Sequence, residues 1–126
     1  MNSRNKGATG ERELAKVLRG YGYDCRRGQQ YCGANGDADV VGMPGLHIEC
    51  KRVERLNLDD AMAQAKSDAR EEEIPVVMHR KNNGEWRVTI LLEDFVVIYR
   101  EWERRKELKE DKCGCCKLWK QTKPML

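Results

Sequence analysis

The sequence predicts an α/β fold in which one central sheet is flanked by helices, in the order α-β-β-α-β-β-α. Two short apolar runs, near residues 38–42 and 46–51, flank a turn at residues 43–45. Asn83-Gly84 is a strong hairpin signal between two further runs. Apolar residues at helical spacing precede the first run, at Leu14, Val17, Leu18 and Tyr21.

The first helix is predicted to begin near Thr9, which is a suitable N-cap residue, after a flexible segment at residues 1–8. Gly20 and Gly22 are expected to end it. Residues 25–36 are rich in glycine and arginine, so we interpret them as a basic loop.

The second half of the chain predicts the remaining elements. A helix is expected over about residues 57–72, where small apolar residues form a narrow stripe. Pro75 opens a strand at residues 76–80, and a partner strand follows at residues 86–92. The last helix is expected from about Glu93, with an apolar face formed by Phe95, Val96, Tyr99 and Trp102.

At 126 residues and 14.6 kDa the chain is expected to form one domain, residues 1–126. Residues from about 104 to 126 are polar and contain cysteines, so a disordered tail is expected there. No apolar run is long enough to span a membrane, and the N-terminus lacks the apolar core of a signal peptide. A cytoplasmic location is therefore predicted.

The chain contains six cysteines, and cytosolic thiols are normally reduced. The CGCC stretch at residues 113–116 could bind zinc, but it lacks C-x2-C spacing and a nearby histidine. Free thiols are the alternative, and the one we favour.

The net charge of +3 is unevenly distributed, with basic residues in excess before residue 37 and after residue 99 and acidic residues in excess between them. This pattern suits a polyanionic ligand held at the periphery of an acidic centre. An ordinary solvated surface would explain the charges equally well.

The predicted hairpin places acidic residues opposite each other. With residues 43–45 as a three-residue loop, Asp39 lies across from Glu49, and Asp37 lies across from Lys51. Asp39, Glu49 and Lys51 then share one face of the sheet. Facing like charges destabilise a sheet, so a hard divalent cation held by carboxylate oxygens is one interpretation. The other is an exposed face on which the acids are solvated and Lys51 pairs with one of them.

Glu11 adds a third carboxylate. It lies three residues before Leu14 and seven before Leu18, on the flank of the buried helical stripe. An acid in a first helical turn is also favoured by the helix dipole, which explains its place near the N-terminus but not its place on the flank.

Taken in order, KGATGEREL, a basic loop, DADVVG and HIECK resemble the archaeal-type Holliday junction resolvases and their phage-borne relatives, in the PD-(D/E)XK nuclease superfamily. The E-x-K element is residues 49–51, the D-hydrophobic-hydrophobic element is residues 39–41, and the helix glutamate is Glu11. Ala38 stands where the superfamily name expects proline, and Asp37 competes with Asp39 for the metal-ligand position.

The resemblance covers about residues 6–100 and implies a restriction-endonuclease-like mixed sheet. It implies that Lys51 acts on the attacked phosphate or orients the attacking water, and that Gln64 orients that water or Lys51. A solvent-facing polar residue is the alternative for Gln64. The implied ligands of one or two Mg2+ ions, or of Mn2+ in their place, are Glu11, Asp39, Glu49 and the backbone carbonyl of Cys50. The candidate contacts to the DNA backbone are Lys6, Arg12, Arg26, Arg27 and Arg52, and an ordinary surface cation is the alternative for each of them.

The function implied is a Mg2+-dependent, structure-selective DNA endonuclease of recombination and repair, active as a homodimer on four-way junctions in a bacterial or phage-infected cell. One alternative is a PD-(D/E)XK nuclease with another repair, replication or restriction role. A further alternative is a non-catalytic DNA-binding module of the same fold, which the intact set of acids with Lys51 disfavours.

Overall fold

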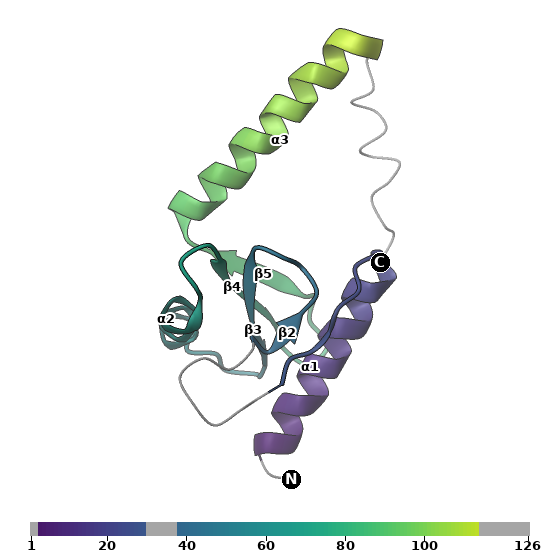
Figure 1. Ribbon diagram of the computed structural model, residues 1–126. Coiled ribbons are helices and arrows are strands. Elements are labelled where there is room, and N and C mark those ends of the chain that lie inside the picture. The colour runs from purple at the N-terminus through teal and green to yellow at the C-terminus, as the bar shows by residue number, and fades with distance from the viewer. Residues whose placement is uncertain (1–2, 30–37, 114–126) are drawn as a thin grey trace. The chain divides into compact units, whose positions relative to one another are not determined.

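The computed structural model describes residues 3–29 and 38–113, and the chain divides into two compact units, Met1–Leu91 and Leu92–Leu126. The prediction of a single domain stays a prediction. The first unit holds a five-stranded sheet with helices α1 (Ser3–Gly20) and α2 (Leu58–Asp68), and the second holds helix α3 (Leu92–Cys113) (Figure 1).

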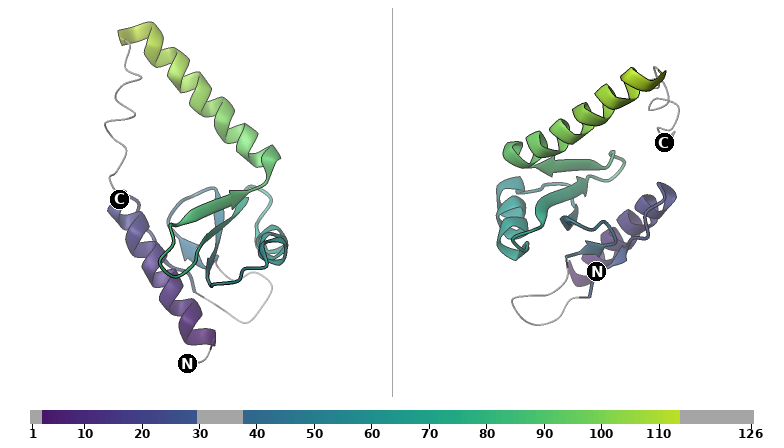
Figure 2. Two further views of the ribbon diagram at one scale, coloured as in Figure 1. Left: turned by 180° about the vertical axis from the view of Figure 1, so that it is seen from behind. Right: turned by 45° about the horizontal axis from the view of Figure 1, so that its top comes forward.

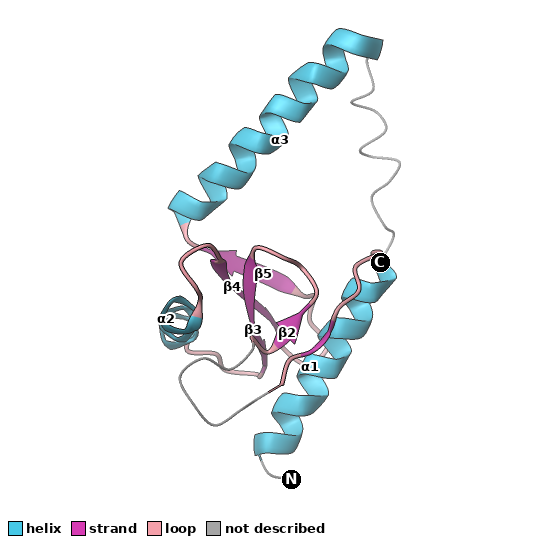
Figure 3. Ribbon diagram, in the orientation of Figure 1, coloured by secondary structure: helices cyan, strands magenta, loops and turns pink. Residues whose placement is uncertain are grey.

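The sheet is mixed. Its strands lie in the order β1-β2-β3-β4-β5, with β3 and β4 parallel and the other pairs antiparallel (Figure 3). Because helices flank this mixed sheet, the predicted α/β class with a mixed central sheet is confirmed. The strand bounds, from β1 to β5, are Arg26–Arg27, Val40–Val41, Leu46–Arg52, Ile74–Arg80 and Arg87–Ile90.

The two helices of the first unit cover opposite faces of the sheet (Figure 2). On the face of α1, the core consists of Leu14, Ala15, Cys25, Val40, Ile48, Cys50, Val76 and Met78. On the face of α2, the core is smaller and consists of Ala61, Met62, Ala65 and Val77. Alternation along β3 and β4 assigns neighbouring residues to these two faces.

The first unit differs from the predictions at the start of α1, at the end of α2 and in an additional strand, β1. Helix α1 begins at Ser3, so it includes residues 3–8, where no proline interrupts the helix. Strand β1 was not predicted, because two arginines carry no apolar alternation. Helix α2 begins after Asn57 as predicted, and the Asn57 side chain accepts a hydrogen bond from the Asp60 N–H at 3.1 Å. It ends before the predicted boundary, since Ala69 is extended.

Helix α3 continues to Cys113, through part of the segment expected to be a disordered tail. That segment is rich in glutamate, lysine and arginine, which favour helices, and Arg104 pairs with Glu101 at 3.3 Å. Residues 114–126 lie outside the described residues, and with them most of the CGCC stretch. In the part of the chain that the structure describes, no helix is both long and apolar enough to cross a membrane.

Candidate active site

The hairpin of β2 and β3 has the predicted register. Val40 pairs with Ile48, which places Asp39 beside Glu49. The Asp39 N–H donates to the Ile48 carbonyl at 3.0 Å, and a carboxylate oxygen of Asp39 accepts the Cys50 N–H at 2.9 Å. The N–H and C=O of one strand residue point toward the same edge, so the Cys50 carbonyl is also directed toward β2.

Gly42 fixes the start of the hairpin turn. Its φ of +122° is strained for any residue with a side chain, and a Cβ there would lie 2.3 Å from the Asp24 carbonyl oxygen. The turn therefore packs directly against the backbone just before β1. This contact anchors the hairpin that carries Asp39.

The Asp39 and Glu49 carboxyl groups lie together in a largely buried place. Burial is the main cause that raises the pKa of Asp39 to about 7, followed by the negative charge of Glu49. The Cys50 N–H opposes this rise, and Glu11 adds to it. A pair of carboxyl groups that holds a proton near neutral pH is a place where a cation is favoured.

Glu11 is buried, at 7 % exposure, on the flank of α1 as predicted. A Cβ at the neighbouring Gly10 would lie 3.0 Å from the Arg52 Cβ, so this part of α1 approaches β3 closely. The carboxylate of Glu11 forms an ion pair with Arg27 of β1, with Nε and Oε2 at 2.5 Å. Arg27 was predicted to contact DNA, and here it neutralises a predicted metal ligand.

His47 was missed by the sequence analysis, although it precedes Glu49 by two residues on the same strand face. It is 3 % exposed, and its Nε2 lies 3.1 Å from Glu49 Oε1. This hydrogen bond is the main cause that raises the pKa of His47, and Glu73, 3.8 Å from Nδ1, contributes. His47 thus holds one side of the Glu49 carboxylate.

His47, Glu49 and Asp68 offer ligand atoms that all lie within 4.8 Å of one another. Among the described residues this is the one group of three side chains placed so closely. Glu11, Asp39 and Glu49 do not form such a group in this conformation, in which Glu11 is held by Arg27. The predicted set of metal ligands therefore stays a prediction. The group of His47, Glu49 and Asp68 is a second candidate set of ligands.

Lys51 lies two residues after Glu49 on the same face and forms no ion pair with a described residue. Asp37, its predicted partner across the hairpin, lies outside the described residues. Gln64 is exposed on α2, and its Nε2 donates to Asp68 Oδ2 at 2.6 Å. Through this bond Gln64 contacts Asp68, a member of the second candidate set of metal ligands.

The predicted DNA contacts fall into two classes. Arg12 and Arg26 are exposed, as a phosphate contact requires. Arg27 and Arg52 are engaged in ion pairs, with Glu11 and, at 3.1 Å, with Glu13. The side chain of Lys6 lies outside the described part of the structure.

Comparison with solved structures finds a similarity to Hjc, a Holliday junction resolvase from the archaeal hyperthermophile Archaeoglobus fulgidus, solved at 1.6 Å resolution. The sequences are 22% identical, the match covers 68% of this chain and 72% of that chain, and the TM-score is 0.47. Comparison with curated proteins gives no match.

A family model described as "Phage putative PDDEXK endonuclease" matches residues 2–122, which is nearly the whole chain. The β2–β3 hairpin places Asp39 beside Glu49, and Lys51 follows on the same strand. That these residues are the aspartate and the E-x-K stretch of the family stays a prediction. The chain belongs to the phage PDDEXK endonuclease family, and it is an endonuclease.

Proposed function

We propose that this endonuclease is Mg2+-dependent and structure-selective, and that it hydrolyses phosphodiester bonds of four-way DNA junctions as a homodimer. The observation that carries the proposal is the pair of largely buried carboxyl groups of Asp39 and Glu49, with Lys51 beside them on the same strand face. Residues of these types at one site are suited to phosphodiester hydrolysis with a divalent cation.

Asp39, Glu49 and the Cys50 carbonyl would hold the cation, and Glu11 would join them once released from Arg27. The raised pKa of Asp39 supports the fit, because a cation removes the repulsion that causes part of the rise. The oxygen-only donor set suits Mg2+ or Mn2+. When bound, the cation supplies a water of lowered pKa and neutralises charge on the phosphate.

The side chains around this pair have separate tasks. Lys51, which has no carboxylate partner among the described residues, places a positive charge at the attacked phosphate. His47 keeps the Glu49 carboxylate in position through the 3.1 Å hydrogen bond. Gln64 orients the water or Lys51 from helix α2. Arg12 and Arg26, with Lys6, contact the DNA backbone without reading sequence.

A homodimer is proposed because resolution of a junction needs two nicks on strands related by two-fold symmetry, and the described residues of one subunit provide one such acidic centre. Helix α3 supports this proposal with a row of aromatic side chains in tilted contact, Phe95, Tyr99 and Trp102, which are each at least 40% exposed. Val88 of β5 is also exposed, whereas Trp86 packs on the core of the α1 face. The α3 row is therefore the better candidate for the dimer contact.

The experiment is cleavage of a labelled four-way junction and of a linear duplex of the same sequence, each with Mg2+ or with EDTA, alongside sedimentation of the free protein. We expect a dimer that cuts the junction in preference to the duplex and only with Mg2+. A monomer that cuts both substrates equally would reject junction resolution and leave a general repair, replication or restriction nuclease. Cleavage in EDTA would reject the metal dependence.

A further inference from the structure

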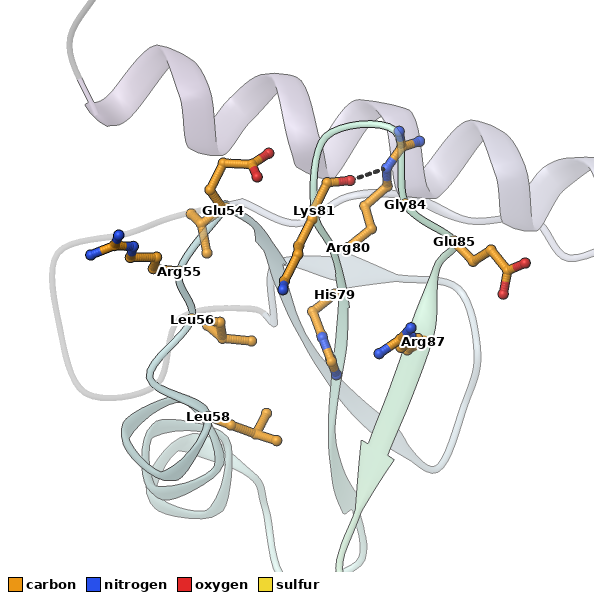
Figure 4. A pocket seen from close by; sticks show the side chains of 11 residues that line it. Glu54, Arg55, Leu56, Leu58, His79, Arg80, Lys81, Gly84, Glu85 and Arg87 are labelled. Carbon is orange, nitrogen blue, oxygen red and sulfur yellow. Dashed lines mark hydrogen bonds between the residues drawn. The ribbon is translucent and has the colours of Figure 1, made fainter.

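A pocket of about 410 Å³ opens at the end of the sheet where the parallel strands β3 and β4 finish (Figure 4). Three segments line it: the connection from β3 to α2, the end of β4, and the start of β5. Its lining includes His79, Arg55, Arg80, Lys81 and Arg87. Of these five residues, Arg80 forms an ion pair with Glu13 of α1.

The pocket has an excess of positive charge that the described residues do not neutralise. Arg80 is engaged by Glu13 at 2.7 Å, and Glu54 accepts the Asn82 N–H at 2.7 Å. Lys81 and Arg87 form no ion pair with any described residue.

The orientation of the side chains matches an anion site. Figure 4 shows the Lys81 ammonium and the Arg87 guanidinium directed toward the space around the His79 ring, whereas Glu85 points away from it. The His79 Nε2 lies 2.8 Å from the Thr89 hydroxyl, which fixes the ring. Burial, and then the charge of Arg87, lower the pKa of His79, so this ring adds no fixed charge at neutral pH.

Strand pairing places residues of the pocket in line with Lys51. Lys51 pairs with His79 across β3 and β4, and His79 pairs with Arg87 across β4 and β5. The three side chains therefore form one row on the α2 face of the sheet. Two strand spacings are about 10 Å, so two phosphates that are near each other on one DNA strand can contact Lys51 and Arg87 at the same time.

We infer that the pocket binds a backbone phosphate of the DNA strand being cut, close to the phosphate contacted by Lys51, through Lys81 and Arg87. That the bound strand is the one being cut rests on the proposed function. That the pocket binds a phosphate rests on the charges of Lys81 and Arg87, which no described residue pairs, and on the strand pairing that aligns Lys51, His79 and Arg87. A phosphate held there fixes how far the strand extends across the sheet before it reaches Lys51.

The test compares wild type with the double variant Lys81→Gln/Arg87→Gln in DNA binding at several salt concentrations with EDTA present. A matched control is Lys16→Gln/Lys66→Gln, which removes the same charge from exposed helix positions. We expect the slope of log affinity against log salt to fall by about 1 in the double variant, as for one lost phosphate contact, and to stay unchanged in the control. All four substituted side chains are exposed, and equal thermal unfolding of the three proteins verifies folding.

A second measurement locates the phosphate. Single phosphates of the DNA are replaced in turn by neutral methylphosphonates. Wild type should lose affinity several-fold at one position, and the double variant should show no further loss at that position. A slope unchanged from wild type, or equal losses in both proteins at every position, would overturn the inference.

A nicking assay of wild type with Mg2+ distinguishes failure of the pocket inference from failure of the proposed function. If wild type nicks DNA and the double variant binds like wild type, the pocket inference fails and the proposed function stands. If wild type nicks no DNA with any divalent cation, yet the slope and the methylphosphonate position respond as expected, the proposed function fails and the phosphate site stands.

Discussion

The two faces of the sheet are built for different tasks. The face of α1 buries large apolar side chains, among them Leu14, Ile48 and Val76 at 2 % exposure or less. The face of α2 buries His47 and Glu49 beside a small cluster of alanine, methionine and valine. Because the central strands β3 and β4 are parallel, both faces must be covered, but only the first is covered by a full apolar core.

The difference indicates where stability and chemistry reside. Burying a carboxylate and an imidazole costs free energy unless they are paired, and the bond from His47 to Glu49 offsets only part of that cost. On the α1 face the buried carboxylate of Glu11 is paired with Arg27, and the larger apolar core there can stabilise the whole sheet. The α2 face can therefore hold groups selected for catalysis and DNA binding.

The largest effect is expected from Lys51→Met, which removes a charge from the α2 face. Cleavage should fall by at least about 100-fold, as when a group that stabilises transition-state charge is removed. DNA affinity should change little, because one lysine is a small part of a wide phosphate contact. Single-turnover cleavage and equilibrium binding measure the two quantities, and Lys66→Met is the control. Cleavage at the wild-type rate would remove Lys51 from the mechanism.

Val76 and Val77 allow a matched comparison of the two faces, since they are adjacent, fully buried and of the same type, but belong to different cores. Val76→Ala should lower the free energy of unfolding by about 2 kcal/mol and leave the cleavage rate of the folded enzyme unchanged. Val77→Ala should cost less, about 1 kcal/mol, because the short helix α2 can move into the space. It should slow cleavage, since that movement displaces Gln64.

Urea unfolding and cleavage assays on the two variants check this expectation. If Val76→Ala and Val77→Ala lose the same free energy of unfolding and cleave at the same rate, the two faces do not divide stability and catalysis between them.

A smaller effect is expected for Asp39→Asn in the absence of metal. The pKa of Asp39 rises from 3.8 to about 7 on folding, so the folded state holds an extra proton between these values. The stability contributed by that proton is complete below pH 3.8 and is lost as the pH rises to about 7. The asparagine side chain of the variant does not titrate, so it has no such loss, and its amide oxygen still accepts the Cys50 N–H.

In EDTA, the melting temperature of Asp39→Asn should therefore exceed that of wild type by several degrees at about pH 8 and approach it at about pH 4. If the difference in melting temperature between Asp39→Asn and wild type does not change with pH, the raised pKa of Asp39 beside Glu49 is contradicted.

The hairpin shows why much of this was predictable from the sequence. The turn at Gly42 and the alternation of β3 fix the register, so the neighbourhood of Asp39 and Glu49 follows from local pattern alone. The flank position of Glu11 likewise follows from helical spacing, and its burial confirms it.

What could not be predicted depends on segments distant in the chain. The ion pair of Glu11 with Arg27 needs β1, whose two arginines have no strand pattern. Asp68 meets His47 only because α2 packs over β3. The basic pocket likewise combines the β3–α2 connection with the end of β4 and the start of β5, which meet at one end of the sheet.

The position of the metal is the central claim, and calorimetric titration of Mg2+ and Mn2+ into three variants tests it directly. We expect Asp39→Asn and Glu49→Gln to lose binding, and Asp68→Asn to bind as wild type does. Retained binding in Asp39→Asn together with lost binding in Asp68→Asn would contradict the claim and place the ion among His47, Glu49 and Asp68.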